Sequence, residues 1–253
     1  MIFDVTDDAY ERFMGRYSTV LGPVFADFAA IEPGLRVLDV GAGTGALTAE
    51  LVRRVGAEHV SAAEPSARFV EGMRERFAGV EVVEAPAEAL PWPDDTFDAA
   101  LAQLVISFVS DPRVAAREVR RVVRPGGVVA FCMWDQDGME MLAAIARARR
   151  AVEPNPVGDE TLKYRTRAEI GGLLEGAGLR DVETGVLEVA REFSGYDELW
   201  SALLGAVGPA GRWVVSLDDD GRAIVRAELH RELGSPEGAF TLRAQCNAGR
   251  GLV

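Results

Sequence analysis

The chain contains little cysteine and little histidine. It has two cysteines, Cys132 and Cys246, and two histidines, His59 and His230. Neither cysteine belongs to a Cys-x-x-Cys pair, so the sequence offers no His/Cys set with the spacing of a zinc site. We therefore expect no metal site, and we expect both cysteines to be reduced and structural.

Basic residues are scarce relative to acidic ones. Lysine and arginine together number 27, whereas aspartate and glutamate number 40, which gives a formal net charge of −13. A chain this acidic repels phosphate backbones and anionic lipid surfaces. We therefore expect neither nucleic acid nor a membrane surface as a partner.

Long apolar runs are absent as well. The longest, at residues 101–109 and 128–134, are too short to span a bilayer. Residues 1–8 lack the basic and apolar parts of a signal peptide. We therefore expect a cytoplasmic protein without a membrane span, present as a monomer or homodimer.

The chain does have enough apolar sequence for a large core. Of its 253 residues, 48% are hydrophobic and 26% are charged, which is typical of a globular protein. This length suits one α/β domain, so we expect a single domain over residues 1–253.

Predicted strands and helices alternate with short connections through residue 134. Asp111-Pro112 predicts a helix start, with aspartate as the cap and proline in the first turn. The alternation is typical of parallel β-α-β units in a doubly wound sheet. The expected strands of this part are Arg36–Val40, Val60–Glu64, Val80–Val83, Phe97–Gln103 and Val128–Trp134, and the expected helices between them include 46–55 and 66–77.

The segments on either side of this alternation are predicted to be largely helical. Residues 9–30 carry Tyr10, Phe13, Met14 and Tyr17 on one helical face. Gly22-Pro23 predicts an interruption followed by a second short helix, and we expect residues 1–33 to form a helical cover. Further elements are expected as helices at 139–152 and 167–177, a loop at 154–156, and strands at 180–192 and 240–249.

The segment between the last two strands, residues 194–238, is helical in character and contains Trp200 and Trp213. It is too long for a hairpin loop and too apolar for a linker. We expect a helical insertion that packs on the sheet edge or forms a lid over the site.

A glycine-rich turn, Asp39-Val40-Gly41-Ala42-Gly43-Thr44-Gly45, follows the first predicted strand. Closely spaced glycines let the backbone approach a ligand, because no Cβ stands in the way, and the following helix presents unpaired N–H groups. Glu64 ends the next strand, 19 residues beyond Gly45. A carboxylate there can accept hydrogen bonds from both ribose hydroxyls of a nucleoside.

Two cofactors compete for this turn. Gly41-x-Gly43-x-x-Ala46 fits the loose dinucleotide pattern of a nicotinamide dehydrogenase. Asp39, however, would oppose a pyrophosphate but suits the cationic ammonium group of S-adenosylmethionine, and Gly45 extends the pattern to G-x-G-x-G. About 35 residues precede the first strand, enough for a helical cover. These features favour S-adenosylmethionine.

Three motifs in order resemble those of class I S-adenosylmethionine-dependent methyltransferases of the type 11 group, which is similar to the ubiquinone/menaquinone-biosynthesis methyltransferases. They are VLDVGAGTG at 37–45, AEALPWPDDTFD at 87–98 and RPGG at 124–127. The resemblance covers about residues 10–135, and the stretch from Tyr10 to Tyr17 also resembles one branch of small-molecule methyltransferases. It implies a Rossmann-like α/β fold, with a mostly parallel seven-stranded sheet that has an antiparallel edge strand.

The resemblance also implies roles at matching positions, with S-adenosylmethionine as cofactor and S-adenosylhomocysteine as product. The glycine turn would hold the methionine and ribose part, Asp39 the ammonium group and Glu64 the ribose hydroxyls. We expect the Tyr17 ring to face the sulfonium. The expected cofactor-binding residues are Tyr17, Asp39, Gly41, Ala42, Gly43, Gly45, Glu64, Pro65, Ala87, Glu88, Gln103 and Leu104.

The acceptor side is expected where the fourth and fifth strands end. Its expected residues are Met14, Gln103, Ser107 and Trp134. Ser107 stands where relatives often carry histidine, so Asp135 is the remaining candidate for a catalytic base. Pro86 stands where many relatives carry an aspartate that takes the adenine amino group. We expect catalysis to rest mainly on positioning.

Simpler roles remain open for the same residues. Asp39 could cap the next helix, Glu64 could be a solvated helix-start acid, and Glu88 could be a loop carboxylate. The aromatic face that includes Tyr17 could be core. The expected function is methyl transfer from S-adenosylmethionine to a small organic molecule. The alternative is a protein that binds S-adenosylmethionine, or a non-methylating enzyme that retains it.

Overall fold

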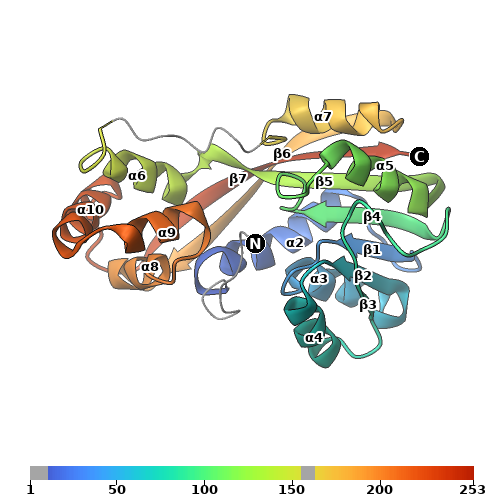
Figure 1. The fold of residues 1–253 in the computed structure, drawn as a ribbon, viewed down its shortest axis with the longest axis horizontal. Coiled ribbons are helices and arrows are strands. Elements are labelled where there is room, and N and C mark those ends of the chain that lie inside the picture. Colours follow the sequence, from blue (N-terminus) through green and yellow to red (C-terminus); the bar gives the residue numbers. More distant parts are fainter. Residues whose placement is uncertain (1–10, 155–162) are drawn as a thin grey trace. The chain divides into compact units, whose positions relative to one another are not determined.

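The computed structural model describes residues 11–154 and 163–253. They form a seven-stranded sheet with the strand order β3-β2-β1-β4-β5-β7-β6, which can be followed in Figure 1. The strands are β1 (Val37–Val40), β2 (Val60–Glu64), β3 (Glu81–Glu84), β4 (Phe97–Gln103), β5 (Val123–Met139), β6 (Arg180–Phe193) and β7 (Phe240–Leu252). Residues 9 and 10 of the predicted first helix, and residues 155 and 156 of the predicted loop, lie outside the described residues.

The first five strands are parallel. β1 pairs with β2 and β4, with Val37 opposite Val60 and Ala99, and β2 pairs with β3. The carboxyl ends of β1, β2 and β4 therefore meet at one edge of the sheet, where ligands bind in folds of this kind. The predicted bounds of β2 and β4 are confirmed.

β7 runs antiparallel to its neighbours. The Gly126 amide donates to the Val253 carbonyl (2.9 Å), and the Val253 amide donates to the Gly127 carbonyl (3.0 Å), so the end of β7 lies beside the start of β5. Arg250 pairs with Glu183 of β6, a contact that places the end of β7 beside the start of β6. These contacts confirm a mostly parallel sheet with an antiparallel strand near one edge.

The described helices connect and flank these strands. Asp111 caps α5 as predicted, because its carboxylate accepts from the amides of Arg113 (2.9 Å) and Val114 (3.1 Å). The helical elements are the π-helix η1 (Glu11–Gly15), α2 (Arg16–Phe28), α3 (Ala46–Val55), the 3₁₀-helix η2 (Ala57–His59), α4 (Ala67–Arg76), α5 (Pro112–Val122), α6 (Glu140–Arg149), α7 (Arg167–Gly176), α8 (Tyr196–Leu203), α9 (Gly208–Ser216) and α10 (Asp219–Glu232). The helical insertion predicted for residues 194–238 is confirmed by α8, α9 and α10.

The predicted interruption at Gly22-Pro23 is wrong, because α2 continues through both residues. Leu21 and Phe25 lie four residues apart on this helix and are both fully buried. The Arg54 guanidinium donates to the Pro23 carbonyl (2.9 Å). Burial of this face and the arginine contact offset the local cost of proline within a helix.

The predicted limits of the fifth strand, 128–134, are also wrong. β5 begins at Val123, which pairs with Phe97, and the register then shifts so that Val128 pairs with Ala99. Residues 124–127 therefore form an irregularity inside the strand instead of a separate loop. At its other end β5 continues to Met139.

The chain divides into two compact units. Among the described residues, the insertion unit comprises 11–20, 136–154 and 188–245, and the core unit comprises 21–135, 163–187 and 246–253. In the core unit, buried side chains of the sheet such as Phe97 and Phe131 belong to one apolar cluster with Val119 of α5 and Leu174 of α7. In the described parts of the chain, no helix is long and apolar enough to cross a membrane.

Candidate functional site

The glycine turn lies between β1 and α3 in the core unit. Gly41, Gly43 and Gly45 all have positive φ angles, of 70°, 56° and 85°, a conformation that glycine adopts without steric cost. The Gly41 amide donates to the Ala63 carbonyl of β2 (2.7 Å). The turn is thus fixed against the neighbouring strand.

Glu64 ends β2 with a buried carboxylate that is bonded at both oxygens. The Gly43 amide donates to Oε2 and the Ser66 amide to Oε1, each at 2.9 Å. Burial raises the pKa of Glu64, although both hydrogen bonds oppose the shift. Its 6% exposure excludes a solvated helix-start acid. Because each carboxylate oxygen has a second lone pair, Glu64 can still accept two further hydrogen bonds.

Asp39 lies in β1, directly before the turn, and is 1% exposed. Its Oδ2 accepts from the Thr48 hydroxyl of α3 (2.6 Å). Burial raises the pKa of Asp39 to about 7; the Thr48 hydrogen bond opposes the shift, and the nearby Glu64 carboxylate adds to it. A second buried carboxylate therefore stands beside the turn. A cationic group bound here would favour the ionised form of both acids.

Replacing Asp39 by Asn should stabilise the ligand-free protein at high pH but not at low pH. The pKa of about 7 in the folded state exceeds the ordinary value of 3.8, so the protonated form favours the folded state and this stability is lost as pH rises through about 7. At about pH 8 the variant should gain on the order of 2–4 kcal/mol, from about 1.4 kcal/mol per pKa unit. Urea unfolding at about pH 4 and pH 8 measures it. A gain independent of pH would contradict the assignment.

The segment after β3 contributes Ala87 and Glu88 to the same edge. Ala87 is 7% exposed, and Pro86 accepts from the Ala89 amide through its carbonyl (3.1 Å). The Glu88 carboxylate accepts from the amides of Ser110 (2.7 Å) and Asp111 (3.1 Å). Glu88 therefore fixes the loop that enters α5, which is the loop-carboxylate role left open by the sequence.

The end of β4 carries a strained residue. Leu104 follows Gln103 with a φ of +64°, which is unfavourable for a side chain larger than glycine. Its amide donates to the Cys132 carbonyl of β5 (2.9 Å). Strained backbone of this kind persists where surrounding contacts hold it and is frequent in binding sites.

Ser107 and Asp135 are linked to a third segment, residues 163–165. The Ser107 hydroxyl donates to the Lys163 carbonyl. The Asn247 amide of β7 donates to the Arg165 carbonyl (2.8 Å) and to Asp135 Oδ2 (3.4 Å). The sequence analysis did not single out Asn247. Its polar amide between the small residues Cys246 and Ala248 of a predicted strand was a signal that could have identified it. This amide links the Asp135 carboxylate to the segment at 163–165.

The structure divides the predicted site residues between the two units. Met14 and Tyr17 belong to the insertion unit, where Tyr17 is fully buried. Burial raises the pKa of the Tyr17 hydroxyl, with Arg16 opposing and Glu140 adding to the shift. The predicted site residues that belong to the core unit are Asp39, Gly41, Ala42, Gly43, Gly45, Glu64, Pro65, Ala87, Glu88, Gln103, Leu104, Ser107, Trp134 and Asp135.

The acids and the glycine turn of the core unit could hold a nucleoside that carries a positive charge. The turn offers close approach at Gly43, where an added Cβ would meet no atom within 4 Å. Glu64 can accept from a vicinal diol, and Asp39 adds a second acid beside it. Among residues 11–154 and 163–253, no group of three or more His, Cys, Asp or Glu side chains could hold a metal ion.

Comparison with known proteins identifies the same segment of the chain. A family model described as "Methyltransferase domain" matches residues 38–131, the segment that holds Asp39, the glycine turn and Glu64. An uncharacterized protein of Mycobacterium tuberculosis is 32% identical over 221 residues, which cover 84% of this chain and 78% of that protein. A demethylmenaquinone methyltransferase of Clavibacter sepedonicus is 37% identical over 138 residues, 52% of this chain and 56% of that protein.

A solved structure with the same fold extends the comparison to the whole chain. It is an S-adenosylmethionine-dependent methyltransferase from Aquifex aeolicus, with a TM-score of 0.53 and 19% identity. The match covers 95% of this chain and 99% of that one. At this identity the likeness concerns the fold alone.

Proposed function

Because this chain belongs to the class I S-adenosylmethionine-dependent methyltransferases of the type 11 group, we propose that it methylates a small organic molecule by in-line transfer. The observation that carries the proposal is the buried Glu64 carboxylate, held by the Gly43 and Ser66 amides beside an open glycine turn. Bound S-adenosylmethionine supplies an activated methyl group. The residues of this chain bind, orient and shield it.

The proposed cofactor contacts follow from the buried acids and the turn. Glu64 accepts from the ribose hydroxyls with its remaining lone pairs. Asp39, oriented by Thr48, faces the methionine ammonium, and the space above Gly43 admits the ribose and methionine backbone. Pro65 and the Ala87 amide flank the adenine, while Glu88 holds the adjoining loop through Ser110 and Asp111.

The proposed acceptor side lies at the end of β4 and along the part of β5 that continues past it, with Gln103, Ser107, Trp134 and Asp135 toward the acceptor. Alignment of the nucleophile with the methyl group can supply about 7–11 kcal/mol of the barrier. We propose a helical cover at residues 1–33, which includes Met14 and Tyr17, and a lid at residues 194–238.

The state of the two cysteines supports a cellular compartment for the proposed enzyme. Cys132 and Cys246 are both buried and unbridged, which is typical of a reducing compartment. We propose a cytoplasmic enzyme whose acceptor is a small organic molecule. The similarity to a demethylmenaquinone methyltransferase makes demethylmenaquinol the first acceptor to test.

Methyl transfer is tested directly with isotopically labelled S-adenosylmethionine. The protein is incubated with trideuteromethyl cofactor and demethylmenaquinol, and in parallel with a bacterial small-molecule extract, and products are identified by mass spectrometry. A labelled product that depends on Glu64 supports the proposal. Bound cofactor with no labelled product from either source would favour a non-methylating protein that retains the cofactor.

Replacing Asp135 by Asn should lower kcat for a methylated acceptor by about 10²–10⁴-fold, because a general base contributes about that much. The affinity for S-adenosylhomocysteine should stay within about twofold, since Asp135 lies on the acceptor side. Steady-state kinetics and calorimetry measure both. The Asp137→Asn variant, with an exposed side chain two residues further along β5, is the control. Equal kcat values for the two variants would exclude Asp135 as the base.

A further inference from the structure

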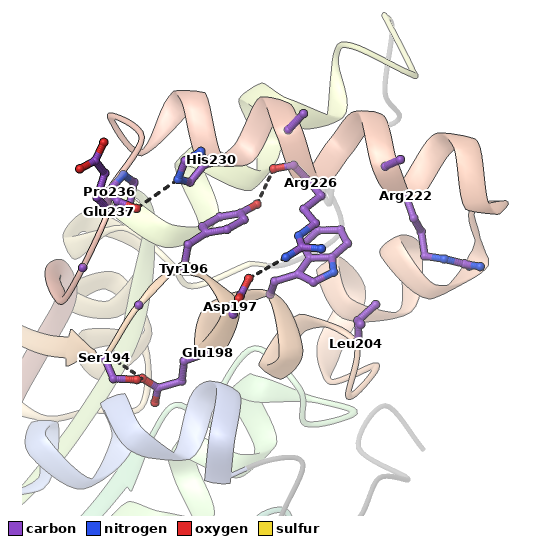
Figure 2. Close-up of a pocket in the computed structure, with 15 residues that line it drawn as sticks. Ser194, Tyr196, Asp197, Glu198, Leu204, Arg222, Arg226, His230, Pro236 and Glu237 are labelled. Carbon is purple, nitrogen blue, oxygen red and sulfur yellow. Dashed lines mark hydrogen bonds and ion pairs between the residues drawn. The ribbon is translucent and has the colours of Figure 1, made fainter.

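A cavity of about 940 Å³ lies between helices α8 and α10 of the insertion unit (Figure 2). Residues 236–238, which precede β7, close one side of it. None of the residues assigned above to cofactor or acceptor binding lines this cavity. Its volume is typical of small-molecule sites, which span about 300–1,000 Å³.

Aromatic and small side chains give this cavity apolar walls. Trp200 of α8 and Leu204, the residue that follows α8, line it; Trp200 is 8% exposed, and Leu204 is 44% exposed although it is a large apolar residue. On α10, Ala223 and Ala227 flank Arg226 and leave space around its side chain. A flat apolar group can therefore lie against α8 without displacing a larger side chain from α10.

Arg226 provides the positive charge in this part of the cavity. Its guanidinium carbon lies 6.0 Å from the Trp200 ring centroid, and its Nη2 pairs with Asp197 Oδ1 at 2.6 Å. The Asp197 side chain is 85% exposed. Exposed ion pairs contribute little, so a ligand carboxylate can replace Asp197 and form two parallel hydrogen bonds with Arg226.

The other charged residues around the cavity are engaged or lie elsewhere. Glu198 accepts from the amide and hydroxyl of Ser194 and pairs with Arg16. The Arg222 guanidinium is held by Asp219 and by the Val215 carbonyl. Figure 2 places Glu237 beside His230, at the end away from Leu204. The part of the cavity between Leu204 and Arg226 is therefore suited to an anion.

We propose that this cavity binds a planar aromatic carboxylate, with its ring against Trp200 and Leu204 and its carboxylate on Arg226. The proposal does not depend on methyl transfer, because the site lies within the insertion unit. Such a ligand has two sources: the acidic end of the methyl acceptor, or a separate effector.

Three matched probes test the ligand class by calorimetry on the full chain: naphthalene-2-carboxylate, its neutral carboxamide and 2-naphthylmethylamine. We expect the carboxylate to bind with a dissociation constant of about 0.1–1 mM and the amide to bind at least about tenfold more weakly. The amine should bind most weakly. Equal binding of acid and amide, tightest binding of the amine, or no binding of the acid would overturn the proposal.

Single-residue variants test whether naphthalene-2-carboxylate binds at Arg226. Arg226→Met should weaken binding of the carboxylate about tenfold or more, whereas Asp197→Asn should tighten it about threefold by removing the competing carboxylate. Arg231→Met, on the same helix but outside the cavity and paired with Glu228, is the control and should have no effect. Unchanged binding in both Arg226 and Asp197 variants would overturn the site.

One further measurement separates the sources of the ligand. 6-Hydroxynaphthalene-2-carboxylate, which carries a second nucleophile on the same ring system, is incubated with S-adenosylmethionine and the unmodified chain or the Arg226→Met variant. An O-methyl product whose formation requires Arg226 assigns the cavity to the acidic end of the acceptor. Binding without such a product assigns the cavity to an effector, and both results support the site. Because the probe is measured without cofactor, failure of methyl transfer leaves this test intact.

Discussion

Replacing Glu64 by Gln should weaken S-adenosylmethionine binding by about 100- to 1,000-fold. The carboxylate accepts from the Gly43 and Ser66 amides and can accept from two ribose hydroxyls at once. A glutamine has one acceptor oxygen and cannot serve all four donors. Hydrogen bonds to a charged group contribute about 1.5–3 kcal/mol each, so the loss of one strong bond or two weaker ones, about 3–4 kcal/mol, gives this range. Isothermal titration calorimetry measures the change.

A matched control lies on the adjacent strand. Glu84 of β3 is opposite Glu64 in the sheet register and its side chain is exposed. Glu84→Gln removes the same charge at the same edge, and it should change the affinity less than about twofold. If both variants bound the cofactor as tightly as the unmodified chain, Glu64 would not be the ribose ligand and the proposed function would lose its main support.

Replacing Gly43 by Leu should abolish measurable cofactor binding, a loss of at least about 100-fold, while the fold persists. An added Cβ at Gly43 meets no protein atom within 4 Å, so the side chain enters the space proposed for the ribose and methionine. The φ of +56° costs a residue other than glycine about 1–2 kcal/mol. Calorimetry measures the affinity, and thermal unfolding measures the stability.

Variants at two other glycines distinguish the effect of backbone strain from the steric exclusion of the cofactor. Gly34 has a φ of +91° and equally open surroundings, so Gly34→Leu carries backbone strain of the same kind but should leave the cofactor affinity unchanged. Gly41 is different, because its added Cβ would lie 2.6 Å from the Val105 methyl groups. Gly41→Ala should therefore mainly destabilise the fold. Normal binding by Gly43→Leu would contradict the proposed cofactor position.

Local signals in the sequence account for the cofactor side of the site. The Gly41–Gly45 turn is determined by residue type, because only glycine adopts its positive φ angles at no cost. Glu64 follows an apolar run of strand length, so its place at the sheet edge follows from the strand itself. The Asp111-Pro112 cap is similarly local and is confirmed.

The failed predictions involve contacts between distant parts of the chain. Gly22-Pro23 resembles a helix break, but Arg54, which binds the Pro23 carbonyl, lies about 30 residues away in sequence. The start of β5 depends on its pairing with Phe97. Secondary-structure propensity depends on a residue and its sequence neighbours. Contacts between distant segments of the chain override it at these two places.

The sequence by itself determined the doubly wound alternation, the glycine turn and the acid that follows the second strand, since each depends on local conformation and apolar periodicity. Only the tertiary structure decided that Asn247 contacts Asp135, that Glu88 is bonded to the loop before α5, and that α8 and α10 line a cavity. These features come from side chains brought together by packing. Their pairing depends on strand order and helix placement, which no local pattern encodes.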